Sequence, residues 1–541
     1  MKNKILHSDY TPIYGGRQVV ISFDYEAHVP EDDPVVLLCE EMERLDYSKL
    51  YAAYSKDGRK PVVSPKIMFM LIVFAYMNNI FSSREIEKAC KYDIRFMYIL
   101  NGESIPSHNS ISRFRSERLQ GGVMEDLFDQ FVQRLKIKGE ISAENIFIDG
   151  TKIEAYANRY TFVWRKSVEK NRDKLLLKIA ALMDTVNAEL NISIKENRSK
   201  LHMLNQLIKG LQKIKEQRQI EFVSGKGKRK TDIQKFSEKA AEYRSKLLEY
   251  KTHLDKMGSR NSYCKTDNDA TFMRMKEDHM RNGQLKPAYN VQVGTDAGYV
   301  VGIDISQERS DMNTLIPFMK QLERRLVYRY NNVVADAGYD SEENLVYLHQ
   351  NRQNAYIKPA TYEKSKTRRY KNDIGLAANM DYSEFGDLYI CHAGRVLYYE
   401  YEKKEQTKSG YMRRTSVYRC ESCEGCPYKK KCIKTGNCKT PIEERTKTLY
   451  VSRTHSTLKQ RSQNLIRSEK GKQLRMNRSI QSEGFFGVLK EDKHFRRFLL
   501  RSSVKVEIEM QLLGLSFNIM KYYNKIRSEK TQQHLYELKV A

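Results

Sequence analysis

Two short apolar runs in this chain each end in an aspartate. Residues 146–148 precede Asp149 and residues 333–335 precede Asp336, and a glycine follows each aspartate within two positions. Short runs of Ile, Val and Phe predict buried strands. A carboxylate at the end of a buried strand is unfavourable unless it is paired or bound to a metal ion. One such strand end would fit an ordinary turn, but its recurrence indicates a shared site.

A third acidic residue, Glu483, lies far downstream in a stretch with a helical pattern and many basic residues. On a helix, Glu483 shares one face with Gly487, which leaves room for close approach, and with Lys490, which could reach a phosphate. Phosphodiester chemistry must relieve negative charge on the phosphoryl group and activate an oxygen nucleophile, and two carboxylate-bound divalent ions do both. We therefore predict that Asp149, Asp336 and Glu483 bind two Mg²⁺ or Mn²⁺ ions and, with Lys490, form a catalytic site.

Rigid elements must hold these side chains, and the sequence predicts a mixed α/β sheet. Alternating residues predict a strand at 288–294 and a return strand at 299–305, followed by a helix at 311–326. Asp304 and Asp311 are also acidic near this sheet, and the sequence leaves open whether one of them assists. The expected units are an N-terminal helical domain (1–140), the α/β core (141–160, 285–360 and 471–525), a helical hairpin insertion (161–284), a Cys-rich insertion (361–470) and a polar tail (526–541).

The chain has 541 residues, enough for several domains, and a formal net charge of +27. A charge excess of this size indicates a polyanionic partner, most often nucleic acid, although ribosome- and membrane-associated proteins can be equally basic. The first ten residues lack an apolar signal core, and the longest apolar run, 67–77, is too short to cross a bilayer. We expect a cytoplasmic, nucleoid-associated protein that binds double-stranded DNA and no membrane.

Basic side chains are concentrated in two stretches that suit DNA contact. Residues 106–118 form the last of several short predicted helices joined by tight turns, an arrangement typical of a helix-turn-helix module. The second stretch precedes Glu483. Arginine-rich helices are often only solvated surfaces, so the overall charge carries part of this prediction. We predict DNA contacts by five residues: Arg113, Arg115, Arg118, Arg475 and Arg478.

Five of the nine cysteines lie between Cys420 and Cys438, and this crowding indicates metal binding rather than disulfides. Four thiolates with short spacers satisfy a tetrahedral ion, so a structural Zn²⁺ site is the first expectation. An iron–sulfur cluster has similar spacing, and unliganded cysteines are the third alternative. The predicted ligands are Cys420, Cys423, Cys426 and Cys432, with Cys391 and Cys438 as reserves.

Several motifs together carry a family resemblance. They are a helical segment at 45–118 that contains the motifs 65–68 and 106–114, three strand motifs at 147–152, 286–292 and 335–340, and a helix motif at 482–490 that holds Glu483 and, after six intervening residues, Lys490. In these motifs the chain resembles the DDE transposases of bacterial insertion sequences, most closely the group numbered eleven-eighty-two. The resemblance spans most of the chain apart from the details of its insertions.

The resemblance implies an RNase H-like core, dependence on Mg²⁺, and cleavage with strand transfer at transposon ends. It also implies a homodimer, because two ends must be brought together. One departure stands out: the family pattern often places Tyr and Arg at set steps before the Glu. Here Met476 stands where an aromatic residue is expected, and Arg475 and Arg478 do not fit the usual spacing.

Two other functions remain open at this point. A metal-dependent nuclease on the same core would cut DNA without joining a 3′-hydroxyl to a target. A non-catalytic DNA-binding protein with a coiled-coil arm would show no Mg²⁺-dependent cleavage and no effect of carboxylate substitutions.

Overall fold

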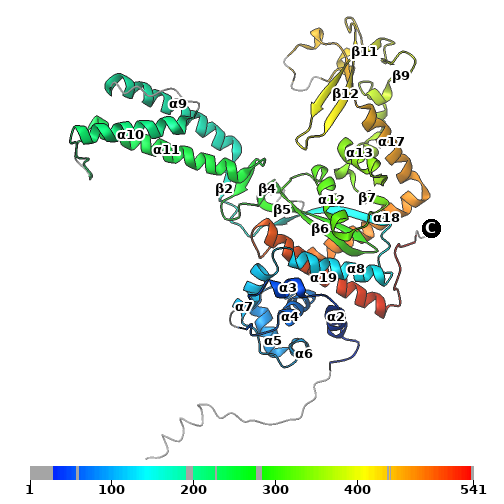
Figure 1. Cartoon of the computed structure of the whole chain (residues 1–541). Helices are drawn as coiled ribbons and strands as arrows, with labels where there is room; N and C mark the ends of the chain where they lie inside the picture. Colours follow the sequence, from blue (N-terminus) through cyan, green and yellow to red (C-terminus); the bar gives the residue numbers. More distant parts are fainter. Residues whose placement is uncertain are drawn as a thin grey trace, which may run out of the picture.

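A mixed α/β structure confirms the predicted fold class (Figure 1). The computed structural model describes residues 29–537 except 56–59, 191–198, 226–227, 276–282, 435–437 and 439. Helices near the N-terminus lie on one side of a central sheet, a helical arm extends from it, and a second sheet lies on the opposite side (Figure 1). The central sheet holds the predicted strand-end aspartates, so its construction decides the geometry of the site.

The central sheet has six strands, and its order follows from their pairing. β1 pairs in parallel with β7 and β7 with β8, while β5 runs antiparallel to β1, β4 and β6. This arrangement, with three parallel strands extended by an antiparallel hairpin, is the RNase H-like order. The strands are β1 (Asn145–Glu154), β4 (Thr271–Arg274), β5 (Leu285–Asp296), β6 (Tyr299–Ser306), β7 (Asn332–Ala335) and β8 (Asn354–Ile357).

A row of asparagines crosses the three parallel strands at their first residues. Asn332 donates its amide to Asn145 Oδ1 over 2.8 Å, and Asn354 donates to Asn332 Oδ1 over 3.0 Å. The same residues are register partners in the two ladders. Because a buried amide is costly unless it is hydrogen-bonded, this row favours a single register for all three strands.

Both faces of the central sheet are covered. Ile146 and Ile148 join the main core on the side of α12 (Leu315–Leu326). Gly294 on β5 faces the same side, where a Cβ atom would lie only 2.8 Å from the Phe318 ring. Phe147 and Val334 pack on the other side against α17 (Arg453–Arg467) and α18 (Glu469–Gly487). A strand buried on both faces explains the continuous apolar run before Asp149.

The apolar run at 67–77 forms the centre of the N-terminal helical part. Every residue from Met68 to Met77 is buried, and this helix packs against α19 (Ser503–Arg527), which in turn packs on β6. Across the described ranges, no helix has the length and apolar character needed to cross a membrane. The helices of this part are α2 (Pro34–Glu43), α3 (Ser48–Ala52), α4 (Pro65–Met77), α5 (Ser83–Tyr92), α6 (Ile94–Leu100), α7 (His108–Arg113) and α8 (Val123–Ile137).

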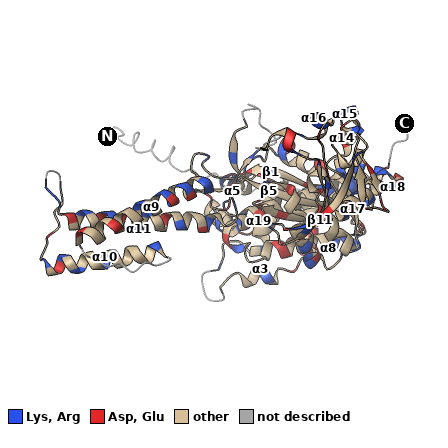
Figure 2. Cartoon of the chain, turned by 90° about the horizontal axis from the view of Figure 1, so that it is seen from above, with Lys and Arg blue, Asp and Glu red and all other residues tan. Residues whose placement is uncertain are grey.

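The arm contains three helices, not the predicted two-helix hairpin. They are α9 (Arg165–Leu190), α10 (Lys200–Gln217) and α11 (Asp232–Met257), which pack around a core of their own that includes Ile179 and Leu207. Basic and acidic residues alternate along its surface (Figure 2). The short pair β2 (Phe162–Trp164) and β3 (Ser262–Cys264) closes its base. The apolar spacing in the sequence does not show that α9 and α10 are separate helices.

The Cys-rich segment forms a second sheet with five antiparallel strands. Its order is β13-β12-β11-β10-β9, a simple meander. The chain returns to the core at Arg453, where α17 packs on β8, so the core layer begins earlier than the predicted residue 471. The strands are β9 (Asp381–Ser383), β10 (Leu388–Ile390), β11 (Val396–Gln406), β12 (Met412–Cys420) and β13 (Thr448–Val451).

Candidate active site

Asp149 and Asp336 occupy equivalent positions on neighbouring parallel strands. Ile148 on β1 is the register partner of Ala335 on β7, and each aspartate is the next residue. Side chains alternate along a strand, so both aspartates follow the direction of Phe147 and Val334 toward α18. Asp149 is 9 % exposed. It is not at the end of its strand, because β1 continues to Glu154 beside β5; it marks the end of pairing with β7.

Glycines beside the two aspartates leave room for the polar groups of the site. Asp149 Oδ1 accepts a hydrogen bond from the N–H of Gly150 over 2.9 Å, and Asp336 Oδ1 accepts one from the N–H of Gly338 over 2.7 Å. A Cβ on Gly150 would lie 2.6 Å from Gln292 Nε2, and one on Gly338 would lie 2.9 Å from Asp336 Oδ1. Any side chain at these positions would displace the polar groups packed around the carboxylates.

Arg478 lies between Asp149 and the third predicted ligand, Glu483. Its Nη2 is 3.0 Å from Glu483 Oε1, and its Nη1 is 3.8 Å from Asp149 Oδ2. Arg478 and Glu483 both belong to α18, and this helix covers the face of the sheet toward which Asp149 points. The Glu483 side chain is 56 % exposed. The three predicted acidic residues thus share one edge of the sheet, with a guanidinium between two of them.

The three carboxylates suit a hard divalent cation, but they are not close enough together to coordinate one ion as they stand. Carboxylate oxygens are the ligands that Mg²⁺ and Mn²⁺ prefer. In the part of the chain that the structure describes, no three His, Cys, Asp or Glu side chains are already placed to hold a metal ion. An ion shared by Asp149 and Glu483 would have to displace the Arg478 guanidinium from between them.

Lys490 does not follow Glu483 on a regular α-helix. α18 ends at Gly487, and the chain continues as a π-helical turn, Val488–Asp492, that carries Lys490. The predicted step of three residues from Gly487 to Lys490 therefore loses its α-helical geometry. π-turns are frequent at functional sites, but their position is not visible in a periodic pattern.

A basic cavity opens beside Asp336. It has a volume of about 490 Å³, and its wall includes Tyr356 and Met476. The Arg475 guanidinium carbon lies 5.6 Å from the centre of the Tyr362 ring at the edge of this region. A cation over an aromatic face is held in place without losing its charge. The four cations that line the cavity are Lys358, Lys472, Arg475 and Arg478.

The three N-terminal arginines differ in exposure. Arg113 is exposed. Arg118 is partly exposed, donates to the Ala53 carbonyl over 2.6 Å and lies over the Tyr54 ring. Arg115 is only 5 % exposed and donates to the Tyr76 hydroxyl over 3.0 Å. The prediction of DNA contact by Arg115 is therefore corrected, since this side chain lies inside the helical part.

Three of the four predicted cysteine ligands, Cys420, Cys423 and Cys432, pack around a small core of the second sheet. Cys420 and Cys423 are buried, and Cys391 and Cys432 pack against the same cluster. Burial first, and then the neighbouring sulfurs of Cys423 and Cys391, raises the pKa of Cys420 to about 11. Among the described residues these thiols do not come together as a metal-ligand group, so this arrangement lends no support to the predicted zinc or iron–sulfur site.

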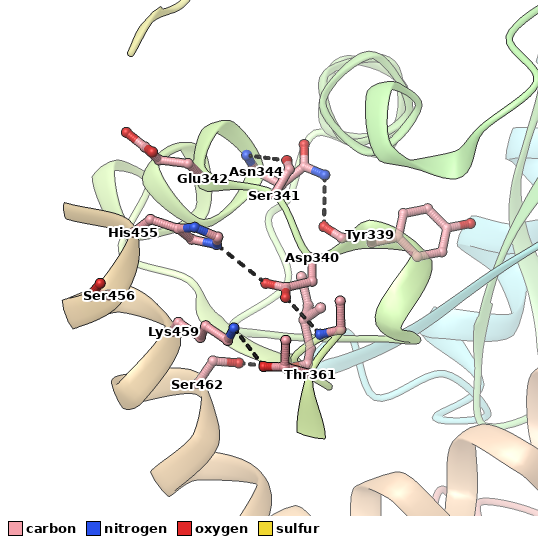
Figure 3. Close-up of polar contacts among 12 residues, drawn as sticks. Tyr339, Asp340, Ser341, Glu342, Asn344, Thr361, His455, Ser456, Lys459 and Ser462 are labelled. Atoms are coloured by element: carbon pink, nitrogen blue, oxygen red, sulfur yellow. Dashed lines mark hydrogen bonds and ion pairs between the residues drawn. The ribbon is translucent and has the colours of Figure 1, made fainter. Parts of the chain in front are cut away.

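Asp340 is the last residue of the strand motif at 335–340, and its side chain points away from the site. Its Oδ2 accepts a hydrogen bond from the Ala360 N–H over 2.7 Å, and its Oδ1 lies 3.7 Å from His455 on α17. Figure 3 shows the Asp340 carboxylate directed toward His455. Nearby, Lys459 donates to Thr361 Oγ1 over 2.8 Å. Burial acts to raise the pKa of Asp340, but the His455 and Ala360 contacts outweigh it and lower this pKa below its usual value. Asp340 thus fastens α17 to the core.

Two family models match parts of the chain. A family model described as "Transposase DDE domain" matches residues 390–523, which include Glu483 and Lys490. A second model, described as a transposase domain, matches residues 23–117. Neither range reaches Asp149 or Asp336, whose place in the site rests on the geometry above. The chain matches no curated protein and no solved structure.

Replacement of Asp340 by Asn should lower the melting temperature, because a buried carboxylate bonded to polar partners contributes about 1–3 kcal/mol. Since the folded-state pKa of Asp340 is lowered, this contribution is present above the unfolded pKa of about 4 and is lost as the pH falls through the lower folded pKa. Thermal unfolding of wild type and variant at pH 7 and at about pH 3 measures it. The difference should shrink in acid.

Asp381→Asn, at an exposed position on β9, is the matched control and should change the melting temperature little at either pH. A full-sized difference between wild type and Asp340→Asn in acid would contradict the assigned role of the carboxylate.

Proposed function

We propose that this chain, which belongs to the DDE transposases of bacterial insertion sequences and is of the group numbered eleven-eighty-two, cleaves DNA at the ends of its element and joins the freed 3′-hydroxyl to target DNA. The observation that carries the proposal is the placement of Asp149 and Asp336 side by side on parallel strands. A pair of copies would bring the two ends together. The substrate is double-stranded DNA, in keeping with the net charge of +27.

Asp149, Asp336 and Glu483 are the residues that would hold divalent metal. Two bound Mg²⁺ or Mn²⁺ ions would supply an activated oxygen nucleophile and relieve the charge on the scissile phosphate. The rigidity of β1 and β7 fixes the two aspartates, since the sheet is covered on each face; Asp149 is buried and Asp336 is partly exposed. Lys490 follows Glu483 on the adjoining π-turn and would steady a phosphate of the bound strand.

Arg478 has two roles in this proposal. Its guanidinium lies beside both Asp149 and Glu483 and offsets their charges. It also lines the cavity beside Asp336, so a modest rotation of one side chain would carry its charge from the carboxylates to a DNA phosphate. An arginine suits both positions, because its planar fork pairs with carboxylates and with phosphates.

The basic cavity gives the path of the DNA strand. Lys358, Lys472 and Arg475 line it, and Asp336 lies in its wall. A strand that follows these cations brings one of its phosphates to the aspartate pair. The exposed Arg113 on α7 adds a contact farther along the DNA.

Replacement of Asp149 by Asn is expected to abolish strand cleavage in Mg²⁺ while leaving binding to the element ends intact. The carboxylate would hold metal, and even changes outside the ligand shell of a metal site cost about 10- to 100-fold. Cleavage of a labelled end fragment and a gel-shift titration measure the two effects. Asp340→Asn is the control and should retain cleavage. Normal nicking by Asp149→Asn would refute the assignment.

Removal of the two cations Lys472 and Arg475 by alanine substitution should weaken DNA binding whatever the sequence. Each lost phosphate contact should reduce the slope of log Kd against log salt by about 0.9. The measurement is a binding titration at several salt concentrations in the presence of EDTA, so that cleavage does not interfere. Lys470→Ala on the same helix, where Lys470 pairs with Glu144, is the matched control. An unchanged slope in the double variant would remove the cavity from the DNA path.

A further inference from the structure

The carboxylate of Asp311 lies at the edge of the site, on the side of α12. It opens the short 3₁₀ turn Asp311–Asn313 that leads into α12. Its Oδ1 accepts hydrogen bonds from Asn290 Nδ2 over 2.7 Å and from Gln292 Nε2 over 3.1 Å. Both donors lie on β5, beside β1. Two neutral amides fix the orientation of this carboxylate and leave its negative charge in place.

Asp311 reaches the glycines that adjoin both aspartates of the site. Its Oδ1 lies 2.8 Å from the point that a Cβ on Gly150 would occupy, directly after Asp149. Its Oδ2 lies 3.5 Å from the corresponding point on Gly338, and Asp336 Oδ1 lies 2.9 Å from that same point. The absence of side chains at the two glycines therefore lets Asp311 approach the aspartate pair from the face opposite to α18.

Tyr339 links the three carboxylates to the amides that orient Asp311. Its hydroxyl donates to Gln292 Oε1 and is fully enclosed. Burial first, and then the negative charges of Asp311, Asp149 and Asp336, raises the pKa of Tyr339 well above its usual value. One hydroxyl thus lies within the field of all three aspartates. A role for Asp311 only in anchoring β5 would account for the two amide bonds to Oδ1 but not for the place of Oδ2, which lies beside the same open point at Gly338 as Asp336 Oδ1.

We propose that Asp311 is a further carboxylate ligand of the divalent metal site, which it approaches from the α12 side while Glu483 approaches from the α18 side. The inference rests on the proposed function. Asn290 and Gln292 act as positioning residues, because their bonds to Oδ1 fix the carboxylate with Oδ2 on the side of Gly338. Binding of a cation would draw Asp311, Asp149 and Asp336 together into a cage that they do not form by themselves.

Replacement of Asp311 by Asn tests the proposal, because an asparagine oxygen still accepts the two amide bonds while the charge and one ligand oxygen are lost. Titration of the full chain with Mn²⁺ alone, followed by electron paramagnetic resonance, reports metal affinity without DNA or cleavage. We expect Asp311→Asn to weaken Mn²⁺ binding by about 10-fold or more. Asp336→Asn should weaken it comparably, and Asp340→Asn, a neighbouring aspartate turned toward α17, should leave it unchanged. Wild-type affinity in Asp311→Asn alone would overturn the inference.

A second measurement uses the unaltered chain and so does not depend on the folding of a variant. Fe²⁺ in place of Mn²⁺, with ascorbate and peroxide, generates hydroxyl radicals that cut the backbone next to the bound ion. We expect cuts near residue 311 as well as near 149 and 336. Cuts near 149 and 336 without any near 311 would overturn the role of Asp311. Wild-type Mn²⁺ affinity in both Asp149→Asn and Asp336→Asn would instead refute the metal site and with it the proposed function.

Discussion

The parallel ladder between β1 and β7 is the constraint on which the site depends. Only four residue pairs form it, from Asn145 with Asn332 to Ile148 with Ala335, and the two aspartates come next. A slip of one residue would turn Asp336 to the opposite face of the sheet. The asparagine row at the start of the ladder opposes such a slip, because each amide would lose its partner. The polar row at one end of the strands thus keeps the acidic pair aligned at the other.

The two sides of the aspartate pair are stabilised in different ways. On the α18 side a cation, Arg478, offsets the charge of Asp149 and Glu483. On the α12 side neutral amides from Asn290 and Gln292 bind Asp311. A guanidinium cancels negative potential, whereas an amide only orients the oxygen that it bonds. The negative potential at the edge of the sheet therefore persists toward α12, whereas the positive charge of Arg478 lies toward the basic cavity.

The sequence predicted the elements with strong local patterns and missed those set by tertiary packing. The apolar runs before Asp149 and Asp336 and the mixed sheet were predictable, because burial on both faces leaves a continuous apolar signature. The burial of Arg115 was not, since an arginine inside a helical bundle has the same local pattern as one on its surface. The π-turn that carries Lys490 leaves no periodic signal, and the helical spacing of the arm does not show that it forms three helices and not two. Asn290 and Gln292 did offer one: two polar residues alternating within a buried strand indicate a group to be held there.

The segment that follows the Glu483 helix connects the site to the arm. Arg497 donates to the carbonyls of Ala155 and Ala157, over 3.2 and 3.0 Å, where the chain leaves β1 on its way to α9. Arg501 donates to the Tyr156 carbonyl over 2.9 Å at the same exit. The arm is inserted after β1 without interrupting the ladder with β7, because that ladder ends at Ile148 and β1 continues to Glu154 before the arm begins. Because these arginines lie a few residues beyond Lys490, a short stretch of chain leads from the helix that carries Glu483 to the base of the arm.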